Sequence, residues 1–300
     1  MEAAEIGIST NVGIIRDHIE AKFADAKIEN SPFPHLIIED FWPDDVFQKL
    51  VEWNPFKQNA GSRWMDEKES HNVSARTPYH ARKQINFHAN ELFDAPQEQL
   101  EFWNAIKGIF LGDDWFPRLV LEKFPLIFQY RFGDLIKEDD FFNLFYREFF
   151  LQRHEPGYVI GPHTDIPSRV FTCIFSLARE EGWEEFGTEL LRPKDRLDRC
   201  WGNDHYDYEK FEIAKIAPYK PNNFLLFHKT RHSFHSVRSI TKDVPDERYG
   251  MQFQFYEPYG GLFNDLSAPE LMHVVRRNST KPESGRLSKI KRIVQRAIAS

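Results

Sequence analysis

The chain has 300 residues, with 46 Asp and Glu against 39 Lys and Arg, so its net charge at pH 7 is −7. This length fits one large domain or two small ones, and the acidic balance argues against a general nucleic-acid binder. Its two cysteines are too few for a disulfide framework, and neither a signal peptide nor a membrane span is recognisable, so a cytoplasmic protein is expected.

The N-terminal part of the chain predicts mainly helices. Apolar residues at helical spacing indicate a helix over 10–25, and an apolar run indicates a buried strand over 35–41. A proline followed by two aspartates is typical of a helix N-terminus, so a second helix is expected over about 43–53. Residues 54–85 are polar and loop-like. One or two further helices are expected over about 94–123, where large apolar residues recur at helical spacing.

From about Leu126 the chain changes to short strands separated by turns, and its 28 Phe, 10 Tyr and 7 Trp favour a β-rich core. Strands are expected over 126–132, 143–154, 157–162, 169–177, 187–192, 212–217, 223–228, 233–239 and 248–256. Many short strands after a helical part are typical of a jelly roll backed by helices, a mostly β arrangement of the α+β class. We therefore expect one domain over 1–270, with a helical support over about 1–125 and a jelly-roll core over about 126–258.

Residues 193–212 form a charged, aromatic insertion between two of the expected strands. The insertion carries Trp201, His205, Tyr206 and Tyr208. A loop of this length in a compact domain is usually functional or mobile, so we take it as a candidate lid. Its aromatic side chains suit either stacking on a substrate ring or anchoring of the loop itself.

The C-terminal residues 271–300 differ from the rest of the chain in charge. They contain eight Lys and Arg against one acid, a net charge of +7, which leaves −14 for the remainder. Apolar residues recur at helical spacing between Arg286 and Ser300, so a basic tail helix docked on the domain is expected. The alternative is an amphipathic helix that touches a membrane surface or an acidic partner.

A His-Thr-Asp sequence is the most informative motif of the chain. Residues i and i+2 of an extended segment project to the same side, so His163 and Asp165 can bind one metal ion together. Two imidazoles and one carboxylate form the facial triad of a non-haem Fe(II) centre, which leaves the opposite coordination face open. His235, seventy-two residues after His163, is the best candidate for the second imidazole. His228 and His232 compete with it, although His232 would face the opposite side of a strand from His235.

Thirteen residues after His235, Arg248 begins a strand-like run with strict alternation. One face of this run is polar (Arg248, Gly250, Gln252, Gln254) and the other is apolar (Tyr249, Met251, Phe253, Phe255). If the apolar face packs on outer helices, the polar face lines the cavity, where a buried arginine needs an anion. A guanidinium binds a carboxylate through two parallel hydrogen bonds, so Arg248 is expected to bind a dicarboxylate cosubstrate.

Five segments together carry a resemblance to a known family. They are Pro32–Trp42, Arg153–Asp165, Gly187–Leu190, Phe234–Val237 and Arg248–Gly250. In combination they resemble the Fe(II)/2-oxoglutarate-dependent oxygenases, and they are most similar to the prolyl-4-hydroxylase-like branch. The resemblance covers roughly residues 32–258 and leaves out the tail and the insertion at 193–212.

The resemblance implies a double-stranded β-helix, a distorted jelly roll with Fe(II) at its open mouth. His163, Asp165 and His235 would hold the iron, and 2-oxoglutarate, used together with O2, would place its far carboxylate on Arg248. Many relatives carry this basic residue nearer to the last histidine, so Arg238 is the reserve candidate. Related halogenases replace the carboxylate ligand by a small residue, so Asp165 favours hydroxylation. No catalytic side chain is expected beyond the metal ligands.

The function implied is a dioxygenase that hydroxylates an unactivated C–H bond and releases succinate and CO2. The expected substrate is a small metabolite or biosynthetic intermediate, and the second candidate is a peptide, as for prolyl-type hydroxylases. Two other interpretations remain open: a cupin-like metalloprotein that does not use 2-oxoglutarate, and a non-catalytic jelly-roll module that binds a sugar or a peptide. Jelly rolls host many functions, so the fold alone does not separate these alternatives.

Overall fold

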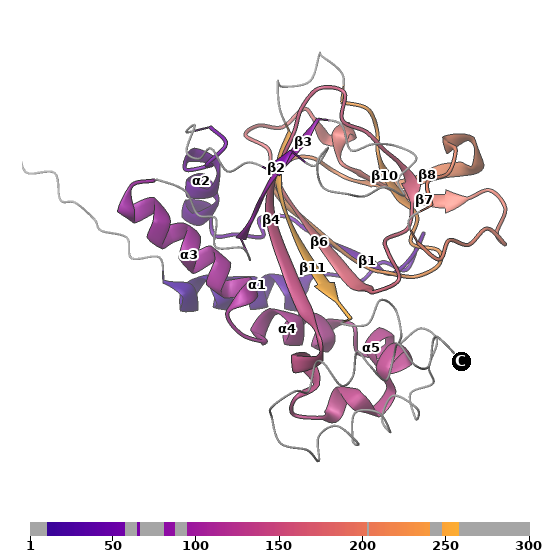
Figure 1. Ribbon diagram of the computed structural model, residues 1–300, viewed down its shortest axis with the longest axis horizontal. Helices are drawn as coiled ribbons and strands as arrows, with labels where there is room; N and C mark the ends of the chain where they lie inside the picture. The colour runs from indigo at the N-terminus through magenta and orange to yellow at the C-terminus, as the bar shows by residue number, and fades with distance from the viewer. Residues whose placement is uncertain are drawn as a thin grey trace, which may run out of the picture.

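The computed structural model describes residues 11–57, 65–66, 81–87, 95–202, 204–240 and 248–257, and its strands form two antiparallel sheets (Figure 1). The large sheet has the order β1-β9-β6-β11-β4-β3-β2, and the small sheet has the order β5-β10-β7-β8. The strands are β1 (His35–Ile38), β2 (Met65–Asp66), β3 (Arg82–Asn86), β4 (Tyr146–His154), β5 (Ile160–His163), β6 (Arg169–Leu177), β7 (Thr188–Pro193), β8 (Phe211–Ala217), β9 (Pro221–His228), β10 (His235–Val237) and β11 (Arg248–Tyr256).

Strands β4 to β11 form the barrel-like part of the fold. In chain order they alternate between the two sheets, except that β7 and β8 both belong to the small sheet. Four of them are therefore neighbours in the large sheet, in the order β4-β11-β6-β9, and the other four make up the small sheet. This connectivity is that of a double-stranded β-helix, or distorted jelly roll, so the predicted fold class is confirmed.

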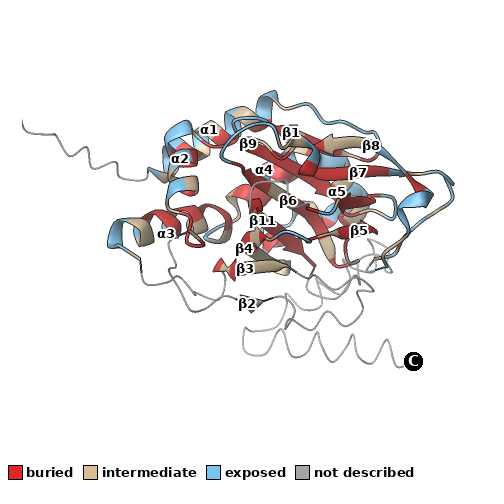
Figure 2. Ribbon diagram, turned by 90° about the horizontal axis from the view of Figure 1, so that it is seen from above, coloured by how far each residue is buried: buried red, intermediate tan, exposed pale blue. Residues whose placement is uncertain are grey.

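Helices α1 to α4 lie against the outer face of the large sheet, and their solvent sides are exposed (Figures 1 and 2). The helices are α1 (Val12–Asp25), α2 (Asp44–Glu52), α3 (Gln97–Leu111), α4 (Trp115–Lys123) and α5 (Pro125–Phe132), with short 3-10 turns η2 (Gly133–Lys137), η3 (Phe141–Leu144), η4 (Glu184–Phe186) and η5 (Tyr208–Lys210). The first four helices lie where the sequence predicts them. Asn11 caps α1, since its side chain accepts hydrogen bonds from the backbone N–H groups of Gly13 and Ile14.

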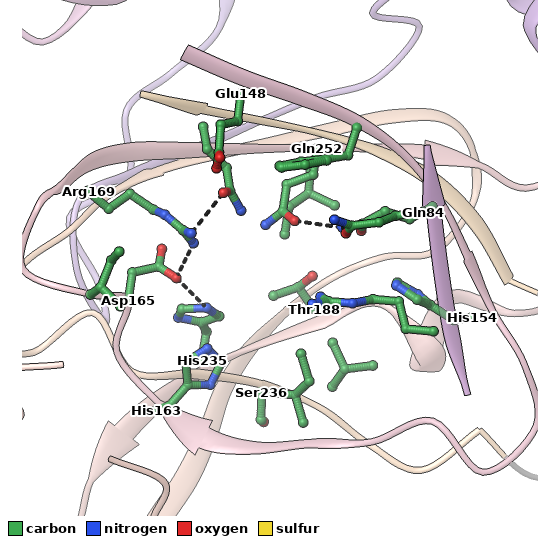
Figure 3. Close-up of a pocket in the computed structure, with 18 of the residues that line it drawn as sticks. Gln84, Glu148, His154, His163, Asp165, Arg169, Thr188, His235, Ser236 and Gln252 are labelled. Atoms are coloured by element: carbon green, nitrogen blue, oxygen red, sulfur yellow. Dashed lines mark hydrogen bonds and ion pairs between the residues drawn. The ribbon is translucent and has the colours of Figure 1, made fainter. Parts of the chain in front are cut away.

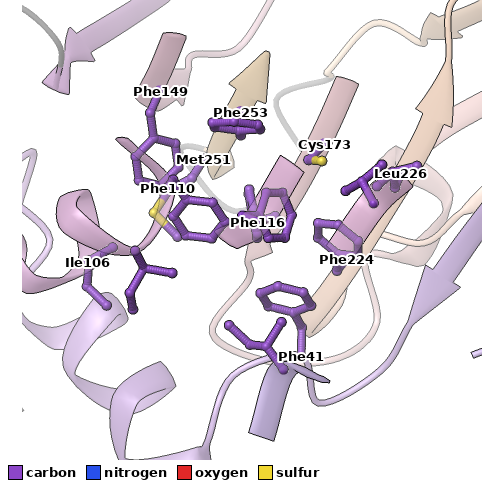
Figure 4. Close-up of a cluster of buried hydrophobic side chains, with 14 of the residues drawn as sticks. Phe41, Ile106, Phe110, Phe116, Phe149, Cys173, Phe224, Leu226, Met251 and Phe253 are labelled. Atoms are coloured by element: carbon purple, nitrogen blue, oxygen red, sulfur yellow. The ribbon is translucent and has the colours of Figure 1, made fainter. Parts of the chain in front are cut away.

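The main core lies between these helices and the large sheet and is largely aromatic (Figure 4). The ring centroid of Phe110 on α3 lies 4.8 Å from that of Phe149 on β4 and 5.6 Å from that of Phe253 on β11. From Phe171 onward, the odd-numbered residues of β6 belong to the same core: Phe171, Cys173, Phe175 and Leu177. These side chains are therefore core residues, and the alternate positions from Thr172 to Ser176 face the small sheet.

The segment 126–132, for which the sequence predicts a strand, belongs instead to helix α5. Pro125 occupies its first turn, where the missing N–H of proline costs no hydrogen bond. Phe128 and Phe132 are fully buried, whereas Tyr130 between them is 94% exposed. The buried side chains are thus four residues apart, which is the spacing of one helix face. Because the segment is short and rich in apolar residues, its hydrophobic pattern fits the repeat of a strand as well as that of a helix.

The stretch 54–85, which reads as a loop, contains β2 and the start of β3. β3 pairs with β4 over five residue pairs, from Arg82 opposite His154 to Asn86 opposite Phe150. The inner face of β3 lines a polar cavity, so its sequence Arg-Lys-Gln-Ile-Asn lacks the alternation of apolar and polar residues that marks a strand.

The insertion at 193–212 is attached to the small sheet. The backbone N–H of Tyr206 donates to the carbonyl of Pro162 at 2.8 Å, and the hydroxyl of Tyr208 donates to the carbonyl of Ile160 at 3.2 Å. The ring of Tyr206 packs on that of Phe234, with 5.7 Å between centroids, so the side chains of both tyrosines anchor the loop. The insertion also contributes His205 to the lining of the cavity between the sheets.

The predicted tail helix within 271–300 lies outside the described residues. The single-domain boundary at about residue 270 therefore stays a prediction. In the part of the chain that the structure describes, no helix is both long and apolar enough to cross a bilayer.

Candidate metal centre and cavity

His163, Asp165 and His235 lie together in a cavity between the two sheets (Figure 3). His163 is the last residue of β5, and His235, the first residue of β10, is its direct partner across the strand pair. One nitrogen or oxygen atom of each of the three side chains lies within 4.8 Å of the others, and all three side chains are buried. No other group of His, Cys, Asp and Glu suited to a metal ion occurs among the described residues. Two nitrogens and one oxygen in this arrangement suit a facial triad.

Backbone hydrogen bonds fix which ring nitrogen of each histidine is free. Nδ1 of His163 lies 2.9 Å from the carbonyl oxygen of Gly161, and Nδ1 of His235 lies 3.0 Å from that of Ser233. A carbonyl oxygen only accepts, so each Nδ1 carries the proton and each Nε2 keeps its lone pair. Burial lowers the pKa of both histidines, that of His163 most strongly, so both are neutral at pH 7. Neutral imidazoles with a free Nε2 are ready to bind a metal ion.

Both oxygens of the Asp165 carboxylate accept hydrogen bonds from β6. Arg169 donates to Oδ1 at 2.6 Å, and the hydroxyl of Thr172 donates to Oδ2 at 2.7 Å. Burial alone would raise the pKa of Asp165, but Arg169, the two histidines and Thr172 together hold it well below its usual range. The carboxylate is therefore ionised, and Oδ1, 3.9 Å from Nε2 of His235, is the oxygen that faces the histidines.

We expect Thr172→Val to weaken metal binding without unfolding the protein. Valine has the shape of threonine but cannot donate to Asp165, and losing such an orienting hydrogen bond costs about 10–100-fold in metal affinity. Calorimetric titration with Ni(II) would measure the change. Thr172→Ser keeps the hydroxyl and should stay close to the wild type. Equal affinities for the valine and serine variants would show that this hydrogen bond does not orient the carboxylate.

The other two histidines considered as the third ligand lie elsewhere. The ring of His228 is buried among aromatic residues, with its centroid 4.7 Å from that of Phe124 and 5.5 Å from that of Phe128. Burial lowers the pKa of His228 to about 3. His232 is exposed. Of the three candidates, the structure places His235 alone beside the His-Thr-Asp motif.

Arg248 lies in the same cavity and has no carboxylate partner among the described residues. Its Nη1 donates to Nδ1 of His154 at 2.8 Å, and its guanidinium lies 5.0 Å from the ring centroid of Tyr219. Within the described part of the chain, Nε of Arg248 and Nε2 of His154 are buried without a hydrogen-bond partner. Figure 3 shows His154 on the opposite side of the cavity from Asp165. A buried cation with one unused donor of its own and a second on the neighbouring His154 is a setting for an anion.

Arg238, the reserve candidate, is already engaged by acidic side chains. Its Nε lies 3.0 Å from Glu189, and its Nη1 lies 3.2 Å from Glu185. It does not belong to the cavity lining, whereas Arg248 does. Of the two arginines, Arg248 is thus the one that a molecule in the cavity can reach.

The cavity has a volume of about 470 Å³, and both sheets contribute to its lining. The small sheet supplies the two histidines, and the large sheet supplies polar side chains from β3, β4, β6 and β11. Among the described residues of the insertion, His205 is the one that lines it. Its ring stacks on that of His163, with 4.9 Å between centroids and an interplanar angle of 14°. The insertion therefore contributes one wall beside the triad.

Three residues of the site are not identified by the sequence reasoning. Arg169, at the start of β6, and Thr172, on its inner face, hold Asp165, and Gln84 on β3 lines the cavity. The alternation of β6 places Thr172 on the face opposite the aromatic residues, which is a signal that could have identified it. Gln84 lies in a strand without hydrophobic alternation, so the sequence carries no comparable signal for it.

The chain matches no protein-family model and no curated protein. Solved structures similar to it include a prolyl 4-hydroxylase from Phytophthora capsici, at 13% identity and a TM-score of 0.46, covering 89% of this chain and 74% of that one. A Pseudomonas putida prolyl-4-hydroxylase is 12% identical, with a TM-score of 0.41 and coverage of 80% and 98%. HygX from Streptomyces hygroscopicus, solved with nickel, 2-oxoglutarate and hygromycin B, is 8% identical, with a TM-score of 0.45 and coverage of 75% and 83%.

Proposed function

We propose that the protein is a non-haem Fe(II)- and 2-oxoglutarate-dependent dioxygenase that hydroxylates a C–H bond of a small molecule. The observation that carries this proposal is the pairing of two features in one cavity. A set of two neutral imidazoles and an ionised carboxylate converges at one place, and a buried arginine without a carboxylate partner among the described residues lines the same cavity. A metal ion and a dicarboxylate together would use both features.

The donor set fits Fe(II). Nε2 of His163, Nε2 of His235 and Oδ1 of Asp165 would hold the ion, since these atoms face one another and carry lone pairs. When bound with 2-oxoglutarate and O2, Fe(II) supplies the oxidation, in which the cosubstrate leaves as succinate and CO2 and one oxygen atom enters the substrate C–H bond. Asp165 stays ionised because Arg169 and Thr172 stabilise its negative charge.

The protein's own contribution is to bind and orient the reactants. Arg248 would pair with the far carboxylate of the cosubstrate, and His154 adds a second donor through Nε2. The aromatic core behind β11 keeps the strand rigid and the base of the cavity closed to water. No side chain need move a proton in this scheme, so we propose no catalytic residue beyond the metal ligands.

A small molecule is favoured over a peptide because the cavity of about 470 Å³ is set between the sheets and its metal-binding side chains are buried. A long peptide would require an extended groove at this place. The peptidyl hydroxylase function suggested by the resemblance is therefore the second candidate.

Ligand binding to the purified protein tests the proposal before a substrate is known. With Ni(II) in place of iron, we expect 2-oxoglutarate to bind with micromolar affinity, and we expect succinate, which lacks the keto group that chelates a metal, to bind much more weakly. Calorimetry under anaerobic conditions measures both. Metal binding without 2-oxoglutarate binding would favour a cupin-like metalloprotein instead. Failure to bind either would favour a non-catalytic binding module.

A further inference from the structure

The His-Thr-Asp motif extends beyond the strand in which it begins. β5 ends at His163, so Thr164 and Asp165 lie in a stretch without strand pairing. β5 is also an edge strand of the small sheet, with β10 on one side and no strand of the described chain on the other. Strand pairing therefore fixes His163 opposite His235, but it does not fix the backbone that carries Asp165. The hydrogen bonds from β6 hold the carboxylate of Asp165, and the position of its backbone requires another support.

The insertion at 193–212 runs along this free edge. The backbone N–H of Tyr206 donates to the carbonyl of Pro162 at 2.8 Å. The hydroxyl of Thr164 donates to the carbonyl of Cys200 at 3.2 Å. Pro162 and Thr164 are the two chain neighbours of His163. The insertion thus holds the chain immediately before and immediately after the first metal-binding residue.

Gly202 brings the backbone of the insertion against the backbone that carries Asp165. A Cβ atom at this position would lie 2.6 Å from the carbonyl oxygen of Asp165 and 2.8 Å from Cδ of Pro167. Both distances are too short for atoms that are not bonded, so a side chain at position 202 would push the two segments apart. The φ of Gly202 is +149°, which also favours glycine. The close contact with the metal-binding motif therefore depends on this glycine.

Lys229 joins the motif and the insertion to the turn that precedes His235. Its buried ammonium donates to Oγ1 of Thr164 at 2.9 Å, to the carbonyl of Thr230 at 3.0 Å and, at the limit of hydrogen bonding, to the carbonyl of Cys200 at 3.4 Å. Each of its three N–H groups thus has an acceptor, as a buried ammonium requires. The three acceptors belong to the motif, the turn and the insertion, so one side chain holds these three segments together.

The same turn orients the third metal-binding residue. The hydroxyl of Ser233 donates to the carbonyl of Thr230 at 3.0 Å and accepts from the backbone N–H of Thr230 at 2.9 Å. The carbonyl of Ser233 accepts from Nδ1 of His235. The insertion contacts this turn as well, since the backbone N–H of Cys200 donates to the carbonyl of Arg231 at 3.0 Å. A continuous set of hydrogen bonds therefore connects the two halves of the triad.

We propose that residues 200–202, Tyr206 and Lys229 form a brace that positions the metal triad, so that the insertion sets the affinity for the metal ion instead of opening and closing as a lid. This inference rests on the proposed function, because that function assigns a metal ion to the triad. Lys229 and Gly202 are positioning residues, since neither lines the cavity and both act through the backbone or side chains of the segments they hold.

Gly202→Ala tests the brace, and Gly182→Ala is its matched control. Both glycines have a positive φ, +149° for Gly202 and +101° for Gly182, so alanine strains the backbone at either position. A Cβ atom at Gly182 would meet no heavy atom within 4 Å, whereas one at Gly202 meets the metal-binding motif. We expect Gly202→Ala to weaken Ni(II) binding about 10–100-fold and Gly182→Ala to leave it unchanged, as measured by calorimetric titration. Equal affinities for the two variants would overturn the inference.

Lys229→Met is an independent test, because it removes all three N–H donors and keeps an unbranched apolar side chain. We expect it to weaken Ni(II) binding about tenfold or more, since Thr164 and Thr230 lose the group that links them. Lys215→Met, the same change on β8 where the lysine pairs with Glu29 at the surface, should not alter the affinity. Wild-type affinity in folded Lys229→Met would show that the ammonium does not position the triad.

Two readouts separate positioning of the triad from general stabilisation. A variant that is only less stable binds Ni(II) with unchanged affinity at a temperature at which circular dichroism shows it to be folded. The visible absorption of bound Co(II) depends on ligand geometry, so we expect it to change in Gly202→Ala and to stay as in the wild type in Gly182→Ala. If the wild-type protein binds no metal ion, the proposed function fails. If it binds the ion and each variant matches its control, the function stands and the brace fails.

Discussion

His235→Ala is expected to reduce metal affinity by more than about a hundredfold, because even the loss of a side chain that only orients a ligand costs about 10–100-fold. The substitution removes one of the two imidazoles and leaves a single histidine and a carboxylate to hold the ion. Without the ion, turnover of 2-oxoglutarate should be undetectable. Calorimetric titration with Ni(II), followed by an assay of succinate release with Fe(II), measures both effects.

His232→Ala is the matched control for this prediction. His232 lies three residues away in the same segment but is exposed and belongs to no metal-binding group. Its removal should change neither metal affinity nor turnover. His163→Ala should reproduce the loss seen for His235→Ala, and circular dichroism would confirm that each variant is folded. Wild-type affinity in folded His235→Ala would refute the assignment of this ligand.

Arg248→Gln is expected to abolish tight binding of 2-oxoglutarate while leaving the metal in place. Removing one partner of a buried, hydrogen-bonded charge pair costs about 2–5 kcal/mol, which is roughly a thirtyfold to several-thousandfold loss of affinity. Glutamine keeps polar atoms at the position, but it carries no charge and cannot form two parallel hydrogen bonds with a carboxylate. The expected result is therefore a much higher dissociation constant for 2-oxoglutarate and an unchanged one for Ni(II).

Two further variants sharpen this test. Arg248→Lys keeps the charge but loses the planar fork, so it should fall between the wild type and the glutamine variant. Arg238→Gln removes the arginine that Glu185 and Glu189 already engage, so 2-oxoglutarate affinity should not change. If Arg238→Gln weakens the cosubstrate and Arg248→Gln does not, the arginine has been wrongly assigned.

Strands with one aromatic face and one cavity face could be located from the sequence. The bounds predicted for 169–177 and 248–256 are those of β6 and β11, since both strands alternate and pack an aromatic face against the helices. The same alternation placed Arg248 on the polar face. The His-Thr-Asp motif could be found because His163 and Asp165 lie two positions apart in the chain, which places both side chains on one side of an extended segment. His235 could be found because the sequence predicts a short strand around it.

Helices and strands whose buried positions are not marked by apolar residues in the sequence could not be located in this way. β3 contributes Gln84 to a polar cavity and has a single apolar residue, Ile85, so no hydrophobic period marks it. Helix α5 has the opposite difficulty, because its exposed side carries apolar and aromatic residues such as Tyr130. Arg169 and Thr172 act through Asp165, and that contact depends on how β6 lies beside the end of β5, which a single sequence does not specify.

His235 pairs directly with His163 across strands β10 and β5. The distance between the two histidines is therefore set by strand pairing and does not depend on the length of the chain that connects them. Once β10 lies beside β5, the seventy-one residues between the two histidines can increase in number at small entropic cost, because the cost of loop closure depends only logarithmically on loop length. A shift of β10 by one residue is different, since it would turn His235 to the other face of the sheet. The connecting chain is thus free to acquire insertions such as 193–212 and to change the substrate it meets, while the three residues of β10 must keep their place.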